Sequence, residues 1–398
     1  MVDPLLVVGV LVAVFVGFNI GGSSTGVAFG PAVGSRVIAK LPAAGLMTGF
    51  ALLGGWTVGR NVVDTMGGQI VPSSYFTLAA SVGILFFIGL ALLISNLFGV
   101  PASTSMTAVG AIAGLGVAAD SIDWTVMGRI VSWWIVAPVI AFWVCAVIGR
   151  YLYPYLEVWL TIDRSGGSIV DLQRVGPVPY PTLADGTNRR EAVGATLVVA
   201  IACYMAFSAG ASNVANAVAP LVGSGELSMN AGILLAAGAI GLGAFTIARR
   251  TLDTVGNDLT DLPLLAALIV EVVSATLITF LSTIGIPASL AVSATMSIVG
   301  LGWGRATRTT RLSDAASSAV RGESAESDGT PDDPERMEAI EHEAVQPIGE
   351  ETEEVAAAMS PPELFDPATT GRVIGLWILT PSLSAVLSYG LFQFVLGV

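Results

Sequence analysis

The stretch SAGASNVANAVAPLVGS (208–224) holds hydroxyls and two amides among glycines and alanines. Its end, 218–224, aligns with FGPAVGS (29–35) in the first half of the chain. In the same way STSMTAVG (103–110) aligns with SATMSIVG (293–300), and GVPAS (99–103) aligns with GIPAS (285–289). Matches at several separate places predict two copies of one unit, 4–150 and 191–398, joined by a polar linker, 151–190.

The composition is typical of a helical membrane protein. The chain has 398 residues, of which 54% are hydrophobic and 12% are charged, whereas a soluble domain carries about 25% charged residues. Apolar runs at 75–98, 125–149, 262–284 and 372–396 are long enough to cross a bilayer as helices. The fold class that we predict is an all-α polytopic protein of the cell membrane.

Loop charges predict how the two copies are oriented. The loop after the first motif carries Arg36 and Lys40 in the first copy but Glu226 in the second. The loop after the second motif is acidic in the first copy and basic in the second. Because basic loops stay in the cytoplasm, we expect two inverted-topology repeats of about five crossings each. Segments 150–190 and 304–371 are then cytoplasmic, and both termini face outside.

The second copy is divided by an acidic segment. Residues 191–311 and a last transmembrane helix at 372–398 flank the segment 312–371, which is rich in Glu, Asp, Ser and Pro. Such a composition cannot bury enough surface to fold by itself, so we expect a disordered cytoplasmic loop. The net charge of −13, with Lys40 as the only lysine, is also typical of a chain from an archaeal halophile.

Four glycine-rich segments interrupt the apolar runs: 17–26, 99–107, 208–216 and 285–297. Irregular backbone in a membrane survives only where protein or water covers it. Inverted-repeat transporters place such interrupted or re-entrant helices around a site near the midplane. Free N–H groups at the starts of half-helices, with hydroxyls and amides, can hold a small anion without Lys or Arg. Close helix packing through small residues is the alternative interpretation.

The residues that we predict to bind the substrate are the hydroxyl and amide side chains of these segments. They are Ser23, Ser24, Thr25, Ser103, Thr104, Ser105, Ser212, Asn213, Asn216, Ser293 and Thr295. The candidates for handling a coupling ion are Asn213, Ser24 and Glu271, an acid inside an apolar span. The counterpart of Glu271 in the first copy is Val82, and a structural, protonated or locally paired Glu is the alternative.

No enzyme chemistry is predicted. His342 is the only histidine and lies in the acidic segment, which excludes a Ser-His triad and a His-rich metal site. Cys145 and Cys203 lie inside apolar runs and are expected to be packing residues. We expect no cofactor and no metal, apart from Na⁺ as a candidate coupling ion.

Two motifs resemble those of a known family. GASNVANAVAPLVGS (210–224) resembles the GxNDxANAxGP signature of the inorganic phosphate transporter (PiT) family, and GVPASTSMTAVGA (99–111) resembles that family's PVSTTHSIVGA. Glu271 matches a family glutamate in the same place. The resemblance covers nearly the whole chain except the acidic loop. It implies an inverted-repeat secondary transporter that moves inorganic phosphate with Na⁺ or H⁺ across the lipid bilayer and can form a homodimer.

The motifs also depart from that family. Its members carry an aspartate in each copy of the first motif, where this chain has Ser24 and Asn213. Its histidine in the second motif is Met106 and Met296 here. This pattern is closer to the bacterial sulfate permease branch, and sulfate, which carries no proton, is satisfied by donors alone. We therefore predict Na⁺- or H⁺-coupled transport of a tetrahedral oxyanion, phosphate or sulfate. The alternatives are a passive anion channel and a membrane sensor that signals through the acidic loop.

Overall fold

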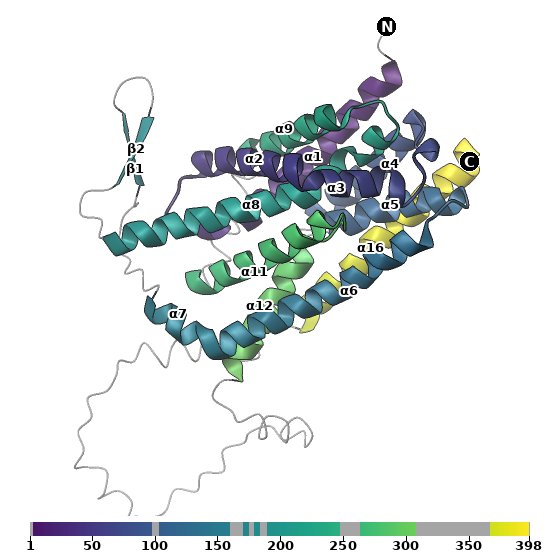
Figure 1. Cartoon of the computed structure of the whole chain (residues 1–398). Coiled ribbons are helices and arrows are strands. Elements are labelled where there is room, and N and C mark those ends of the chain that lie inside the picture. The colour runs from purple at the N-terminus through teal and green to yellow at the C-terminus, as the bar shows by residue number, and fades with distance from the viewer. Residues whose placement is uncertain are drawn as a thin grey trace, which may run out of the picture.

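The computed structural model of the chain describes residues 3–97, 103–159, 170–174, 179–183, 189–246, 263–307 and 367–397. Helices form almost all of this described part, in agreement with the predicted fold class, and Figure 1 shows them as one bundle. A small antiparallel hairpin in the linker, β1 (Val170–Arg174) and β2 (Pro179–Leu183), departs from the all-α prediction. Both termini lie at one end of the bundle, and the hairpin lies at the opposite end (Figure 1).

The helices of the two copies follow the same order. Those of the first copy are α1 (Pro4–Gly34), α2 (Lys40–Thr57), α3 (Gly59–Asp64), η1 (Thr65–Gln69), η2 (Ser73–Tyr75), α4 (Leu78–Leu97), α5 (Thr104–Ala118), α6 (Trp124–Val147) and η3 (Ile148–Leu152), which runs into the linker, where α7 (Tyr153–Trp159) follows. Those of the second copy are α8 (Arg189–Gly223), α9 (Met229–Thr246), α11 (Leu264–Thr283), α12 (Leu290–Ala306), α16 (Pro367–Leu391) and η6 (Phe392–Leu396). The last helix therefore begins before the predicted residue 372, and the acidic segment up to residue 366 lies outside the described residues.

Fewer helices can cross a membrane than the repeats suggested. Six described helices are long and apolar enough, or seven if α2 and the α3–η1 segment, bent by 62°, count as one span. The expectation of about five crossings in each copy is therefore too high for this part of the chain. The reason is helix length: α5 has 15 residues and α12 has 17, fewer than the ~20 that a spanning helix needs.

The short helices α5 and α12 are the second arms of two helical hairpins, α4–α5 and α11–α12. The outer ends of the first hairpin meet, because the Asp123 amide after α5 donates to the Ile70 carbonyl before α4 at 3.0 Å. The arms of the second hairpin touch through the Ser274 and Ser297 hydroxyls, 3.3 Å apart. The predicted interruption at 285–297 is thus a non-helical tip, 284–289, followed by α12. The corresponding residues 98–102 of the first hairpin lie outside the described residues.

The other two predicted interruptions are wrong. Residues 17–26 lie inside the continuous helix α1, and residues 208–216 lie inside α8. A Cβ on Gly21 would stand 1.9 Å from the Ile240 carbonyl oxygen of α9, and a Cβ on Gly210 would stand 2.0 Å from the Ala51 carbonyl oxygen of α2. These glycines let two backbones approach closely while each helix keeps its own hydrogen bonds. For the glycines of these two segments, the alternative interpretation, close helix packing through small residues, is therefore the correct one.

The glycine contacts recur in the two copies. Helix α1 of the first copy crosses α9 of the second, and the corresponding helix of the second copy, α8, crosses α2 of the first. In the same way α5 crosses α16, and its counterpart α12 crosses α6. The matched contacts are Gly21–Ile240 and Gly210–Ala51, Gly243–Phe18 and Gly54–Phe207, and Gly110–Pro381 and Gly300–Phe142. Each copy is therefore packed mainly against helices of the other copy.

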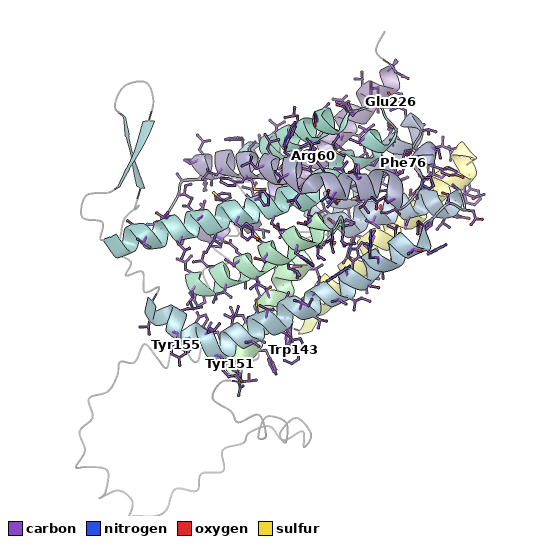
Figure 2. All side chains as sticks on the ribbon, viewed as in Figure 1. Arg60, Phe76, Trp143, Tyr151, Tyr155 and Glu226 are labelled. Atoms are coloured by element: carbon purple, nitrogen blue, oxygen red, sulfur yellow. The ribbon has the colours of Figure 1, made fainter. Side chains whose placement is uncertain are left out.

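Large aromatic side chains cover the outer side of α6 and the segment after it. Figure 2 shows Trp143, Tyr151 and Tyr155 directed away from the bundle, and all three are exposed. Aromatic side chains in such positions are typical of helices that meet a membrane interface. Toward the bundle, α6 instead presents Trp134, whose partner is described below.

Candidate functional site

The predicted binding residues occupy two kinds of position. Ser23–Thr25 and the stretch Ser212–Asn216 lie in the middle of the long helices α1 and α8. Ser103–Ser105 and Ser293 lie at the starts of the short helices α5 and α12. Ser103 caps α5 by accepting from the Met106 amide, and Ser289 caps α12 by accepting from the Val292 amide. The two hairpins therefore begin their second arms inside the bundle, next to the motif helices.

At the centre of these elements, hydroxyl and amide side chains from α1, α5 and α8 form one hydrogen-bonded group, which we call the polar cluster. It consists of Ser24, Thr104, Ser105, Ser212, Asn213 and Asn216. All six were predicted from the sequence. The structure brings together residues that lie more than a hundred positions apart in the chain, for example Thr104 and Asn213.

Asn213 is the hub of the polar cluster. Its Nδ2 donates to Ser24 Oγ at 3.5 Å, and its Oδ1 accepts from Thr104 Oγ1 at 3.3 Å. The same Oδ1 accepts from Asn216 Nδ2 at 3.1 Å, and Asn216 Nδ2 also lies 3.1 Å from Ser105 Oγ. The amide of Asn213 thus links one residue of α1, one of α5 and one of its own helix.

Two of the three serines of the cluster, Ser105 and Ser212, share a backbone acceptor. Ser212 Oγ donates to the Ala288 carbonyl oxygen at 2.7 Å, and Ser105 Oγ donates to the same oxygen at 3.0 Å. Ala288 belongs to the non-helical tip between α11 and α12. Tip and cluster therefore form one connected site, to which both hairpins and both motif helices contribute.

The polar cluster is uncharged and, apart from the half-buried Thr104, buried. Ser105, Ser212 and Asn216 are fully buried, and Ser24 and Asn213 are nearly so. Within the described part of the chain, every hydrogen-bond partner of the cluster is neutral. Asn216 Oδ1 and Ser208 Oγ, which lies about two helical turns away on α8, are buried without a hydrogen-bond partner among these residues. Because unpaired buried polar atoms are costly, they favour an occupant that is small and polar.

Five predicted binding residues lie outside the cluster. Ser23 is exposed and Thr25 is buried, but both hydroxyls donate to backbone carbonyls of α1 itself. Ser103 is used as the cap of α5. Ser293 is buried and lines a small cavity beside the start of α12, while Thr295, two residues further along, is half-buried. The helical period alone does not tell which hydroxyls of a motif turn inward.

The sequence of the chain matches that of known transporters. The sequence pattern of the phosphate transporter family matches residues 20–388. The chain belongs to the phosphate transporter family. This family consists of multi-pass membrane transporters rather than enzymes, in agreement with the apolar spans of the chain.

Relatives within the phosphate transporter family carry two kinds of name. A sulfate permease of Bacillus subtilis is 30% identical over 294 residues, which cover 74% of this chain and 76% of that protein. A provisionally named phosphate permease of Chlamydia pneumoniae is 26% identical and covers 78% of this chain and 92% of that protein. A solved structure of a sodium-dependent phosphate transporter superposes with a TM-score of 0.66 at 17% identity, over 99% of this chain and 100% of that one, which shows a shared fold.

Glu271, the acid inside an apolar span, does not belong to the polar cluster. It sits on α11, is buried, and neither carboxyl oxygen has a partner among the described residues. Ser274 follows it on the same face of α11, since residues three apart are neighbours on a helix, and Ser274 touches Ser297 of α12. A buried carboxyl without a partner is costly when charged, which is the usual setting of a group that takes up a proton.

Three contributors to the site were not predicted. Trp134 of α6 donates from Nε1 to the Pro287 carbonyl, and Asn61 of α3 donates from Nδ2 to the Thr283 carbonyl, both at 2.8 Å. The third is the Ala288 carbonyl. The sequence marks the tip GIPAS as irregular, and irregular backbone needs donors from elsewhere, but it does not say which residues supply them.

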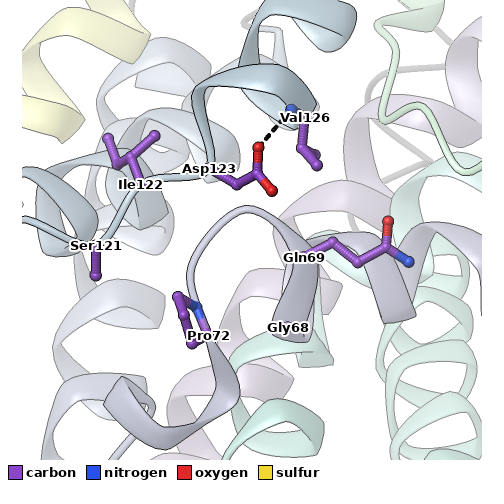
Figure 3. A pocket seen from close by; sticks show the side chains of 7 residues that line it. All are labelled: Gly68, Gln69, Pro72, Ser121, Ile122, Asp123 and Val126. Carbon is purple, nitrogen blue, oxygen red and sulfur yellow. Dashed lines mark hydrogen bonds between the residues drawn. The ribbon is translucent and has the colours of Figure 1, made fainter.

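A larger surface pocket lies away from these residues. It has a volume of about 530 Å³ and is lined by Gly68, Gln69, Pro72, Ser121, Ile122, Asp123 and Val126. Figure 3 shows Asp123 with its carboxylate directed at the start of α6, where it accepts from the Thr125 and Val126 amides. Asp123, the one acid that lines the pocket, is therefore already used to cap α6. Since none of the predicted binding residues lines the pocket either, we do not assign the substrate site there.

Proposed function

We propose that this chain is a secondary active transporter of a tetrahedral inorganic oxyanion and that it prefers sulfate to phosphate. The observation that carries the proposal is the polar cluster, a buried group of neutral hydroxyls and amides at the meeting point of the two hairpins. Hydroxyl hydrogens rotate freely and amides carry two donors each, so the cluster can turn toward the oxygens of an anion. No carboxylate within it repels such an anion.

Two observations support sulfate as the preferred substrate. The positions at which the family carries an aspartate are Ser24 and Asn213, and both lie in the cluster. Sulfate is fully deprotonated at neutral pH and needs donors only, whereas a carboxylate would face it with like charge. The sulfate permease of Bacillus subtilis, similar over three quarters of both chains, is consistent with this preference.

Phosphate is the second candidate substrate, and one atom favours it. Asn216 Oδ1 is a buried acceptor without a partner among the described residues. HPO₄²⁻ carries a proton that such an acceptor can bind, and sulfate does not. The family description and the relative from Chlamydia pneumoniae, both of which name phosphate, support this alternative.

For coupling, the proposal assigns a proton to Glu271. Its carboxyl is buried and unpartnered in an apolar span, and intramembrane acids of this kind commonly form proton relays. Sodium is the alternative coupling ion, with Ser24 and the Asn213 side-chain oxygen as the ligands of interest. If Na⁺ is the coupling ion, Glu271 would be a structural residue that stays protonated throughout transport.

The proposed architecture is a pair of inverted repeats, with the hairpins α4–α5 and α11–α12 re-entering from opposite sides. The exchanged glycine contacts support this arrangement, since each has a counterpart with the roles of the copies reversed. Both termini lie at one end of the bundle and the linker hairpin at the other (Figure 1). Combined with the basic loops, this arrangement supports an orientation in which both termini face outside and segments 150–190 and 304–371 are cytoplasmic.

The test is uptake of labelled sulfate and labelled phosphate into proteoliposomes at high salt, each with an imposed H⁺ or Na⁺ gradient. We expect sulfate to accumulate above its equilibrium level when the inside is alkaline, and phosphate to compete weakly. Phosphate accumulation driven by Na⁺ would make the second candidate correct. Flux that only equilibrates either anion, whatever the gradient, would show a passive channel and contradict secondary active transport.

A further inference from the structure

The tip between α11 and α12 is held by side chains from elsewhere in the chain. Residues 284–289 are not helical, so their carbonyls and those next to them lack helical partners and need other donors. Asn61 of α3 supplies the donor to the Thr283 carbonyl, and Trp134 of α6 supplies the donor to the Pro287 carbonyl. Ser105 and Ser212 supply the donors to the Ala288 carbonyl.

These anchors fall into two groups. Ser105 and Ser212 belong to the polar cluster, whereas Asn61 and Trp134 lie outside it and donate their side-chain N–H groups to Thr283 at the end of α11 and to Pro287 of the tip. The turn itself fits tightly: Gly285 has a φ of +73°, and a Cβ there would stand 2.7 Å from Thr65 Oγ1. A left-handed glycine against a neighbouring helix defines one position for the tip. The Trp134 ring also lines the small cavity of about 10 Å³ together with Met106 and Ser293, so it lies between the starts of α5 and α12.

The serines cannot hold the tip and an anion at once. A hydroxyl carries a single hydrogen, and in this structure the hydrogens of Ser105 and Ser212 are directed to Ala288 or to each other. An oxyanion that binds in the cluster and accepts from these two hydroxyls takes those hydrogens, which frees the Ala288 carbonyl. While the anion is bound, the tip is then held by the contacts of Asn61 and Trp134.

We propose that Trp134, assisted by Asn61, is a positioning residue of the oxyanion site. Its indole N–H holds the α11–α12 tip in place when the serines turn from Ala288 to the substrate. This inference rests on the proposed function, because it concerns the same site. It predicts that removal of the Trp134 donor weakens the anion-bound state more than the empty one, since the empty state keeps the serine anchors.

The test uses Trp134→Phe, which removes the N–H and keeps an aromatic ring, with Trp133→Phe as the matched control. Trp133 is the preceding residue of the same helix and packs edge-on against Phe280 at 5.9 Å. In the proteoliposome assay, we expect the KM for sulfate to rise roughly three- to tenfold in Trp134→Phe, as for the loss of one hydrogen bond. The maximal rate and the thermal unfolding midpoint of the empty protein should change little, and the control should stay near the wild type.

A second variant keeps the inference testable if Trp134→Phe does not fold. Asn61→Asp keeps the size of the side chain but removes the Nδ2 donor to Thr283, and it should also raise KM rather than lower the maximal rate. An unchanged KM in folded variants would overturn the positioning role while leaving the transport function standing. A lower maximal rate at constant KM, or equal losses in the Trp133 control, would likewise overturn it. Absence of uptake in the wild-type protein would overturn the proposed function and this inference with it.

Discussion

The motif helices α1 and α8 occupy equivalent places in the two copies but carry different parts of the site. From α8, three side chains enter the polar cluster: Ser212, Asn213 and Asn216. From α1, only Ser24 does so, and Ser23 donates to its own helix instead. Their glycines, by contrast, make the same backbone contacts. The comparison teaches that the two copies share a packing scaffold, whereas the polar chemistry is concentrated in the second motif helix and the first hairpin.

The shared scaffold can be broken in either helix. A Cβ at Gly210 would overlap the Ala51 carbonyl, and a Cβ at Gly21 would overlap that of Ile240. We expect Gly210→Ala and Gly21→Ala to destabilise the protein equally, by roughly 1–3 kcal/mol or more, which is enough to lower the yield of folded protein. Thermal unfolding in detergent measures this effect.

The control for the glycine variants is Gly238→Ala, because a Cβ there meets no atom within 4 Å. We expect its unfolding midpoint to equal that of the wild type or to exceed it slightly, since Ala favours a helix over Gly. A clear difference between the Gly21 and Gly210 variants would show that the two crossings are not equivalent in energy and would weaken the shared scaffold.

The unequal chemistry predicts unequal losses for equivalent residues. Asn213→Ala removes a hub that bonds to Ser24, Thr104 and Asn216, whereas Ser24→Ala removes one long contact. At about 1 kcal/mol for each hydrogen bond, initial uptake should fall by ~10-fold or more in Asn213→Ala. In Ser24→Ala it should fall only ~2- to 3-fold. Normal transport kinetics in a folded Asn213→Ala protein would contradict the assignment of the site.

Glu271 is a second asymmetry, since its counterpart in the first copy is Val82. Glu271→Gln keeps the shape but cannot release or take up a proton. We expect accumulation driven by a pH gradient to disappear, while exchange of labelled for unlabelled anion across the membrane continues. A Gln variant that still concentrates substrate with a pH gradient would remove the proton role. Val82→Glu, tested alongside, should not restore coupling, because it lies in the other hairpin.

The smallest expected difference concerns the two hairpins. Ser105 at the start of α5 bonds to Ala288 and accepts from Asn216, whereas its counterpart Thr295 on α12 lies outside the polar cluster. Ser105→Ala should reduce uptake roughly 3-fold to 10-fold, and Thr295→Val should reduce it less than ~2-fold. Equal losses of uptake in the two variants would indicate that Thr295 contributes to substrate binding in another conformation of the protein. The two hairpins would then be equivalent in their contribution to transport.

Several predictions from the sequence agree with the structure because they depend on local patterns. The apolar runs at 75–98, 125–149, 262–284 and 372–396 predicted helices, and helices lie there. The prediction of breaks succeeded at GIPAS, where a proline and a left-handed glycine end the helix. It failed at 17–26 and 208–216, where glycines serve helix contact instead of ending a helix. Glycine composition alone does not separate these two uses, since both place small residues in an apolar run.

The sequence by itself determined a multi-pass membrane protein with hydroxyls and amides in its apolar segments. These features follow from composition and spacing along the chain. Only the tertiary structure decided that Ser105, Ser212 and the Ala288 carbonyl meet, that Ser23 and Thr25 stay outside, and that Trp134 reaches Pro287. The physical reason is that a hydrogen bond acts over about 3 Å. Whether two residues distant in the sequence come that close depends on how the helices pack where they cross at the glycines.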